Sequence, residues 1–316
     1  MRVIDFFAGC GGLSLGFMNA GYDICAAFDN WGPAVETYRS NFDHPMINLD
    51  LGGFDGDITP FTIYAPEMVI GGPPCQDFSS AGKRDESLGR ADLTIAYARI
   101  VSAIAPQWFV MENVERAIKT RAYAKARELL AEADYGLTDI ILDASRCGVP
   151  QYRKRLFLIG ERGGADNALE PYLLRNQTQH SMTLREYFGN SLGVDHYYRH
   201  PRSYARRGIF SVDEPSPTIR GVNRPIPKTY NVHPGDTAPV TPDLRPLTTK
   251  ERWMIQTFPE HFKFRGSKSE IEQMVGNAVP VKLAQYVANC ILDFIDSPIV
   301  TEQELHKAPA EQLRLL

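Results

Sequence analysis

Short apolar runs alternate with stretches of helical periodicity through the first half of this 316-residue chain, and this alternation limits the possible folds more than any other feature. The runs typical of buried strands cover residues 3–7, 22–28, 68–70, 108–111, 137–142 and 156–159. Helical spacing covers residues 13–20, 93–104 and 117–133. Because strands that alternate with helices form parallel sheets, we predict an α/β fold: a mostly parallel sheet with helices on both faces.

After Gly160 the alternation is lost. Residues 171–246 are rich in Pro, Arg and Tyr and show little periodicity, although apolar pairs such as Ile209-Phe210 persist. This composition predicts a smaller, loop-rich second domain. Helical order returns at residues 248–256 and 281–295.

Charge is distributed unevenly along the chain. The net charge is -4, but residues 171–247 hold ten Lys and Arg against six Asp and Glu, a local charge of +4. The rest of the chain therefore carries -8. Such asymmetry indicates that the second domain faces an anion, although a chance fluctuation would produce the same pattern.

The composition argues against a membrane protein and against structural zinc. No apolar run approaches the roughly 18 residues of a membrane span, and Asp5 interrupts any signal sequence at once. The five cysteines form no CxxC pair, and histidines do not cluster around them; they are Cys10, Cys25, Cys75, Cys147 and Cys290. We expect a cytoplasmic protein without a metal.

A thiol follows the third predicted strand on a stiff loop. The strand ends at Gly71-Gly72, and Pro73-Pro74 then precede Cys75. Proline fixes φ, and glycine permits close approach of the backbone to a ligand. The segment predicts a platform for a reactive thiol; the alternative is a turn with an incidental buried cysteine.

A glycine-rich loop over residues 5–12 follows the first strand and opens a helix. Its backbone N–H groups can approach a ligand, but the spacing is not the GxGxxG of dinucleotide folds. Asp29 ends the second strand, where it can accept hydrogen bonds from ribose hydroxyls, and Asp50 is placed similarly after the short run Ile47-Asn48-Leu49. Both aspartates can equally be caps or turn formers.

Two further groups lie near predicted strand ends. Glu112 follows the strand 108–111, so it emerges at the carboxyl edge of the sheet, where open α/β sheets bind ligands. A carboxyl group held partly protonated there can act as an acid. Arg153 and Arg155 alternate with their neighbours and share one face; a solvated basic strand edge is the alternative.

These segments, taken together and in order, resemble the cytosine-5 DNA methyltransferases. The matching motifs are Asp-x-Phe-x-Gly-x-Gly-Gly at 5–12, Pro73-Pro74-Cys75-Gln76, Glu112-Asn113-Val114, Gln151-x-Arg153-x-Arg155, Arg245-x-Leu247-Thr248-x-x-Glu251 and Gly276-Asn277-x-Val279-Pro280. They span residues 3–296 apart from the central region. The resemblance implies a Rossmann-like methyltransferase sheet and, since regulatory domains are missing, an enzyme of the bacterial restriction-modification type.

The resemblance also implies the roles of individual residues. Cys75 is the expected nucleophile, Glu112 the acid at the target base, and Arg153 and Arg155 the supports for base and carboxylate. The implied cofactor is S-adenosylmethionine, with Asp29 on its ribose and Asp50 near its adenine. Its other expected contacts are Phe7, Ala8, Gly9, Cys10, Gly11, Gly12, Asn30, Leu51, Pro73, Leu93, Asn277 and Ala278.

The implied substrate is a cytosine flipped out of duplex DNA at a specific sequence. Expected DNA contacts are Ser79, Lys83, Arg84, Arg199, Arg202, Arg206, Arg207, Arg220, Arg224 and Thr248, and residues 80–90 are expected to close over the base. We expect a catalytic and cofactor-binding domain over 1–168, a target-recognition domain over 169–270, a return to the catalytic domain over 271–298 and a tail over 299–316. A monomer and a cognate restriction endonuclease are also implied.

The sequence departs from the family at two places and leaves rival functions open. The family usually has Glu where this chain has Asp29, and an Arg-Gly-x-Leu-Phe-like segment where it has residues 89–93. A transfer-RNA cytosine-5 methyltransferase is the first rival, but its Cys-Phe-Thr signature is absent because no cysteine lies between Cys147 and Cys290. The second rival is a nicotinamide-dependent dehydrogenase, which would leave the Cys75 motif unexplained. The third is an inactive DNA-binding protein, which would not require an intact Cys75 and Glu112.

Overall fold

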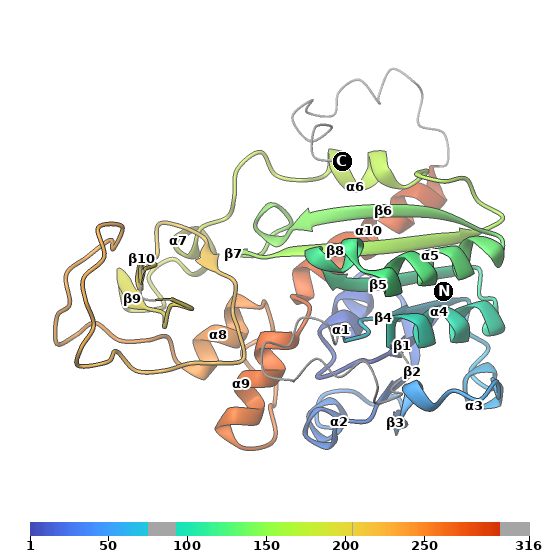
Figure 1. Ribbon diagram of the computed structural model, residues 1–316, viewed down its shortest axis with the longest axis horizontal. Coiled ribbons are helices and arrows are strands. Elements are labelled where there is room, and N and C mark those ends of the chain that lie inside the picture. The colour runs from blue at the N-terminus through green and yellow to red at the C-terminus, as the bar shows by residue number, and fades with distance from the viewer. Residues whose placement is uncertain (75–92, 204, 298–316) are drawn as a thin grey trace.

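A computed structural model describes residues 1–74, 93–203 and 205–297, and a seven-stranded sheet forms its centre (Figure 1). The strand order is β3-β2-β1-β4-β5-β8-β6. The strands are β1 (Arg2–Phe6), β2 (Asp23–Asp29), β3 (Met46–Asn48), β4 (Met68–Gly71), β5 (Trp108–Val114), β6 (Tyr135–Asp143) and β8 (Lys154–Arg162). Strands β1 to β5 pair in parallel, whereas β8 is antiparallel to both β5 and β6. The predicted mostly parallel sheet is confirmed.

Helices cover both faces of this sheet. On one face lie α1 (Gly12–Asn19) and α10 (Val281–Asp296); on the other lie α4 (Leu93–Ile104) and α5 (Arg121–Glu132) (Figure 1). Successive side chains of a strand point to opposite faces of the sheet, so Ile70 packs toward α1 and α10 while Val69 packs toward α4. The short helices α2 (Gly32–Arg39) and α3 (Thr59–Thr62) lie near the β3 edge.

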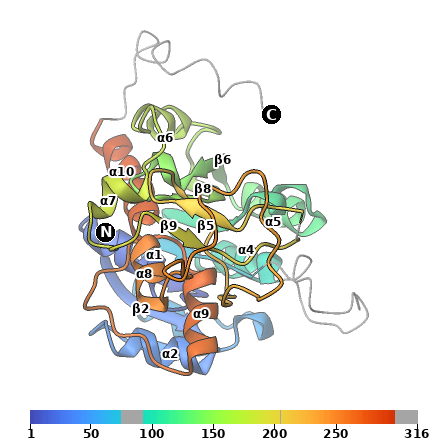
Figure 2. The same cartoon turned by 90° about the vertical axis from the view of Figure 1, so that its left-hand side faces the viewer.

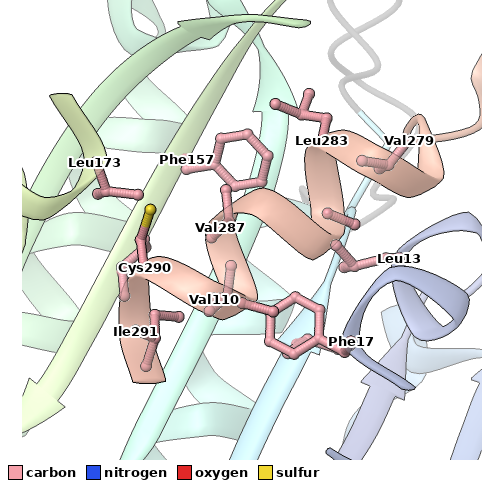
Figure 3. Close-up of a cluster of buried hydrophobic side chains, with 14 of the residues drawn as sticks. Leu13, Phe17, Val110, Phe157, Leu173, Val279, Leu283, Val287, Cys290 and Ile291 are labelled. Atoms are coloured by element: carbon pink, nitrogen blue, oxygen red, sulfur yellow. The ribbon is translucent and has the colours of Figure 1, made fainter. Parts of the chain in front are cut away.

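The helix α10 returns to the sheet from the far end of the chain, as predicted. Its buried residues follow helical spacing, and Figure 3 shows Leu283 and Val287 of α10 in one cluster with Leu13 and Phe17 of α1. By length and composition alone, residues 268–296 could span a membrane. The stretch is nevertheless split into α9 (Lys268–Asn277) and α10, and α10 buries its apolar face in this core.

The remaining elements are short. They are β7 (Gln151–Tyr152), α6 (Glu170–Arg175), α7 (Leu184–Phe188), β9 (His196–Tyr198), β10 (Ile209–Ser211), β11 (Ser216–Pro217) and α8 (Thr249–Ile255). We call residues 176–247 the small lobe; it lies at one end of the sheet, and Figure 2 looks onto this end. Its core gathers Tyr197 and Phe210 from the β9–β10 pair with Ile255 of α8 and Val275 of α9.

Some boundaries differ from the sequence predictions. Strand β5 continues to Val114, so Glu112 lies within the strand and not after it. The helix expected over 117–133 begins at Arg121, because Thr120 caps it and residues 115–119 form a 3₁₀ turn. The predicted domain boundary at 168/169 precedes α6, whose Tyr172 and Leu173 pack in the same core cluster as α10. The predicted tail over 299–316 lies outside the described residues.

Candidate active site

A cleft of about 1540 Å³ opens at the carboxyl edge of the sheet and extends to the small lobe. Its walls come from the ends of β1, β2, β4 and β5, from the 276–279 segment and from arginines of the small lobe. This location agrees with the ligand-binding edge expected of an open α/β sheet. The structure thus brings most of the described candidate residues around one space.

The glycine-rich loop adopts a backbone that few residues tolerate. Phe7, Gly9 and Gly11 have positive φ values of 55°, 54° and 92°. A left-handed conformation is unfavourable for a bulky residue, so the surroundings must hold Phe7 in place. The Gly9 amide donates to Asp29 Oδ2 at 2.8 Å and the Trp31 amide donates to Oδ1 at 2.8 Å. Asp29 therefore ties the loop to the end of β2, while burial raises the pKa of its carboxyl group.

Gly12 brings the same loop against the segment that follows α9. A Cβ atom at Gly12 would lie 2.2 Å from the backbone oxygen of Val279, which only glycine permits. Asn277 and Ala278, the residues just before Val279, line the cleft with the loop. The structure thus brings Asn277 and Ala278 to the same space as the loop of residues 5–12, and their contact with a cofactor stays a prediction.

Residues after β3 and at the start of α4 also line this part of the cleft. Asp50 caps a 3₁₀ turn by accepting a hydrogen bond from the Gly52 amide at 3.0 Å, and it remains exposed. A Cβ atom at Gly52 would lie 2.8 Å from Leu93 Cδ2, so this turn packs on the start of α4. Asn30, Leu51 and Pro73 also line the cleft. Carboxylates beside apolar side chains suit a ligand that combines hydroxyl groups with an aromatic ring.

Glu112 and Arg155 form a shielded ion pair farther along the cleft. Arg155 Nε lies 2.7 Å from Glu112 Oε1, and the two side chains are 13% and 10% exposed. Burial raises the pKa of Glu112, and the charge of Arg155 opposes this increase. A Cβ atom at Gly72 would lie 3.2 Å from Glu112 Oε2, and Asn113 Nδ2 donates to the Pro73 oxygen at 3.1 Å. The pair therefore adjoins residues 72–74, directly before Cys75, which itself lies outside the described residues.

Arg153 has different surroundings from Arg155. Its side chain is 1% exposed and donates to three backbone oxygens, those of Ile219 at 3.0 Å and of Gly276 and Ala278 at 2.9 Å each. These acceptors belong to the small lobe and to the segment after α9. Arg153 therefore positions two walls of the cleft, and these three hydrogen bonds do not involve Glu112.

Sequence analysis missed a second group that supports these walls. Gln151 Nε2 donates to Gln256 Oε1 at 2.7 Å, and Gln256 Nε2 donates to the Val275 oxygen at 2.6 Å. A buried ion pair between Arg252 and Glu272 joins α8 to α9. Helix α9 was also not predicted, although Ser267 and Glu270 form a capping box, a pattern readable in the sequence.

The residues expected to contact DNA fall into two groups: some make contacts within the protein, and others are exposed. Arg199 Nη2 donates to the Thr218 oxygen at 2.7 Å, Arg220 donates to the His200 oxygen, and Thr248 caps α8. Arg207 pairs with Glu214 and lies 4.2 Å above the Phe210 ring. Arg202 and Arg206 are exposed and line the cleft, and Arg224 is exposed outside its lining. Ser79, Lys83, Arg84 and the expected closing loop lie outside the described residues.

Cys10 is buried, and burial raises the pKa of its thiol to about 12. A raised pKa disfavours the thiolate, so Cys10 is a poorer candidate for the nucleophile than an exposed cysteine. Among the described residues, no group of three or more His, Cys, Asp and Glu side chains is arranged to hold a metal ion.

Nearly the whole chain matches a known protein family and known relatives. The family model described as C-5 cytosine-specific DNA methylase matches residues 1–293. The chain is 56% identical over 305 residues to the type II methyltransferase M.HgiDI of Herpetosiphon aurantiacus, covering 96% of this chain and 98% of that protein. It is also 56% identical over 300 residues to the type II methyltransferase M.HindV of Haemophilus influenzae, covering 95% and 99%.

Solved structures share the fold at lower sequence identity. The Schizosaccharomyces pombe (S. pombe) Dnmt2 methyltransferase matches with a TM-score of 0.68 and 17% identity, covering 94% of this chain and 99% of that one. A putative DNA modification methyltransferase encoded within a prophage of Escherichia coli matches with a TM-score of 0.64 and 24% identity, covering 94% and 100%.

Proposed function

This chain belongs to the C-5 cytosine-specific DNA methylases, and we propose that it methylates carbon 5 of a cytosine flipped out of a specific duplex DNA sequence, through a covalent adduct on Cys75. The observation that carries the proposal is the Glu112–Arg155 pair beside residues 72–74. This pair puts a carboxyl group whose pKa is raised by burial next to the segment that leads to the thiol.

The chemistry needs an acid because carbon 5 of cytosine is a weak nucleophile. The Cys75 thiolate adds to carbon 6, and the electrons of the 5,6 double bond move toward ring nitrogen 3, which takes a proton from Glu112. Carbon 5 then accepts the methyl group. Loss of the carbon 5 proton to a base, with expulsion of the Cys75 thiolate, restores the double bond, and nitrogen 3 returns its proton to Glu112.

S-adenosylmethionine, when bound, supplies the electrophilic methyl group. Asp29 suits its ribose, because each carboxylate oxygen accepts one backbone amide and keeps a second lone pair. Asp50 is proposed near the adenine; the glycine-rich loop, Phe7, Leu93, Asn277 and Ala278 are proposed to surround the remainder. The shorter Asp29, where the family usually has Glu, is compatible with this role because the Gly9 amide bonds it directly to the loop.

Arginines of the small lobe are proposed to bind the DNA. Arg202 and Arg206 are the exposed candidates in the cleft. Both relatives at 56% identity are type II methyltransferases, which supports a role in restriction-modification beside a cognate endonuclease. We further propose that the protein is monomeric and cytoplasmic.

A methylation assay tests this function. The protein is incubated with labelled S-adenosylmethionine and either duplex DNA or transfer RNA, and bisulfite sequencing then locates the modified cytosines. We expect label only in DNA, at one recurring sequence, and no label with Cys75→Ser. Label in transfer RNA alone would support the RNA rival, and a fully active Cys75→Ser would refute the covalent route.

A further inference from the structure

One part of the cleft lining carries side chains that the catalytic chemistry does not use. Along the segment from β7 into β8, Gln151 and Arg153 point into the protein and are 0% and 1% exposed. The alternate side chains of Tyr152 and Lys154 are 47% and 51% exposed, and both residues line the cleft. This follows from strand geometry, in which successive side chains face opposite sides.

Arg116 adds a second cation to this wall. It lies just after β5, where Val114 pairs with Arg155, and it lines the same cleft. Within the described residues, no hydrogen bond or ion pair of Arg116 is found. Lys154 has only a loose contact of 3.8 Å with the exposed Glu115, and exposed pairs of this kind contribute little. Both cations are therefore available to an anionic ligand.

Tyr152 is unusual for its exposure. Among the described residues, the large apolar side chains that are exposed include a single aromatic one, that of Tyr152. Its backbone pairs with Pro217 of β11, so its position between the sheet and the small lobe is fixed, and its backbone oxygen accepts from Thr218 Oγ1 at 2.8 Å. An exposed aromatic ring on a backbone fixed in this way, with cations in the same cleft lining, is suited to stack on nucleic-acid bases.

Spacing along the strand indicates which nucleotide Tyr152 reaches. An extended chain rises about 3.3 Å per residue, so the Cα atoms of Tyr152 and Arg155 lie up to about 10 Å apart across the break between β7 and β8. Because Arg155 holds Glu112 at the proposed target base, a ring this far along the chain suits a neighbouring nucleotide better than that base.

We propose that Tyr152, Lys154 and Arg116 form a second DNA-binding wall, in which the two cations bind phosphates of the strand carrying the target cytosine and Tyr152 stacks on a nucleotide next to it. This inference rests on the proposed function. DNA in the cleft then contacts these three residues as well as the small-lobe arginines.

The test measures binding of a duplex that contains the methylated sequence, by fluorescence anisotropy with S-adenosylhomocysteine present and at several salt concentrations. We expect Lys154→Ala and Arg116→Ala each to make the log–log salt slope shallower by about 0.9. Lys125→Ala, which removes an exposed lysine on α5 outside the cleft lining, is the matched control and should keep the wild-type slope. Slopes equal to that control for both variants would overturn the phosphate contacts.

Tyr152 is tested separately from the cations. Tyr152→Ala should weaken binding by about 5- to 150-fold, the range expected for loss of one stacked base, without changing the salt slope. Tyr152→Phe, which keeps the ring, should restore most of the affinity. Wild-type affinity of Tyr152→Ala would overturn the stacking role. Failure of the wild-type protein to methylate DNA would instead refute the proposed function, so the two failures are distinguishable.

Discussion

Arg155 holds Glu112 at 2.7 Å across the β5–β8 pair, in a position that leaves the second carboxylate oxygen directed toward Gly72. The relationship is chemically useful because Arg155 fixes one oxygen and leaves Oε2 beside the segment that leads to Cys75. Burial raises the pKa of Glu112 while Arg155 opposes that increase. A carboxyl group balanced in this way can give up a proton and take it back.

Replacement of this acid should stop catalysis without disturbing the cofactor pocket. We expect Glu112→Gln to slow single-turnover methylation by about 10²- to 10⁴-fold, the usual contribution of a general acid. Glu115→Gln, three residues away and 48% exposed, is the control and should stay near wild type. Calorimetry with S-adenosylhomocysteine should give similar affinities for both variants; a Glu112→Gln rate within threefold of wild type would contradict the assigned role.

The sheet could be predicted because strand and helix periodicity along the first half of the chain are local patterns. The apolar run 108–111 also located Glu112 near the correct edge of the sheet, although β5 continues past Glu112 to Val114. The surroundings of Arg153 could not be predicted, since its acceptors Ile219, Gly276 and Ala278 lie 66, 123 and 125 residues away in sequence. The same holds for Gln256, whose partner Gln151 is 105 residues away.

Replacement of Arg153 should lower the free energy of unfolding of the protein. Arg153→Met removes the Arg153 donors from three backbone oxygens, of which only that of Ala278 keeps a further side-chain donor, Gln256 Nε2 at 3.3 Å, and hydrogen bonds to a charged group contribute about 1.5–3 kcal/mol each. We expect the free energy of unfolding, measured in urea, to fall by at least about 3 kcal/mol. The neighbouring exposed Lys154→Ala should change it by less than about 0.5 kcal/mol. Equal stabilities would show that the three bonds contribute little.

Two glycines provide a matched test of the contact between the glycine-rich loop and the connection from α9 to α10. A Cβ at Gly12 meets the Val279 backbone oxygen at 2.2 Å, whereas nothing lies within 4 Å of one at Gly32. Gly12→Ala should therefore cost about 1–3 kcal/mol of stability and weaken S-adenosylhomocysteine binding at least about tenfold. Gly32→Ala should be neutral or slightly stabilising. If both variants bound S-adenosylhomocysteine equally, the close approach would not matter for the pocket.

The adjacent arginines of the small lobe should behave differently. Arg206 is exposed in the cleft, whereas Arg207 pairs with Glu214 and stacks over Phe210. Arg206→Ala should make the salt slope of DNA binding shallower by about 0.9 if it binds a phosphate, or relax sequence choice if it reads a base. Arg207→Ala should instead lower the melting temperature while leaving the slope unchanged. The opposite pattern in anisotropy and thermal unfolding would reverse the two assignments.

Asp5, beneath the glycine-rich loop, should make stability depend on pH. Burial raises the pKa of Asp5 from 3.8 to about 8, although Ser14 Oγ donates to its Oδ2 at 2.5 Å. The folded protein therefore binds this proton more tightly than the unfolded chain does. The stabilisation is complete below the unfolded pKa and is lost as pH rises through about 8, with a slope of up to about 1.4 kcal/mol per pH unit between the two values.

Asp5→Asn removes this titration while it preserves the shape of the side chain. Urea unfolding of both proteins at pH 5, 6, 7 and 8 should give free energies that diverge, with the wild type losing stability relative to the variant at each higher pH. Because Asp29, Tyr38 and Tyr97 also face Asp5 and are present in both proteins, their contributions largely cancel in the difference. If the difference in unfolding free energy between the two proteins stayed constant from pH 5 to 8, Asp5 would have the same protonation state in the folded and unfolded protein. Its carboxyl group would then have to be ionised in the core, with Ser14 as its stabilising donor.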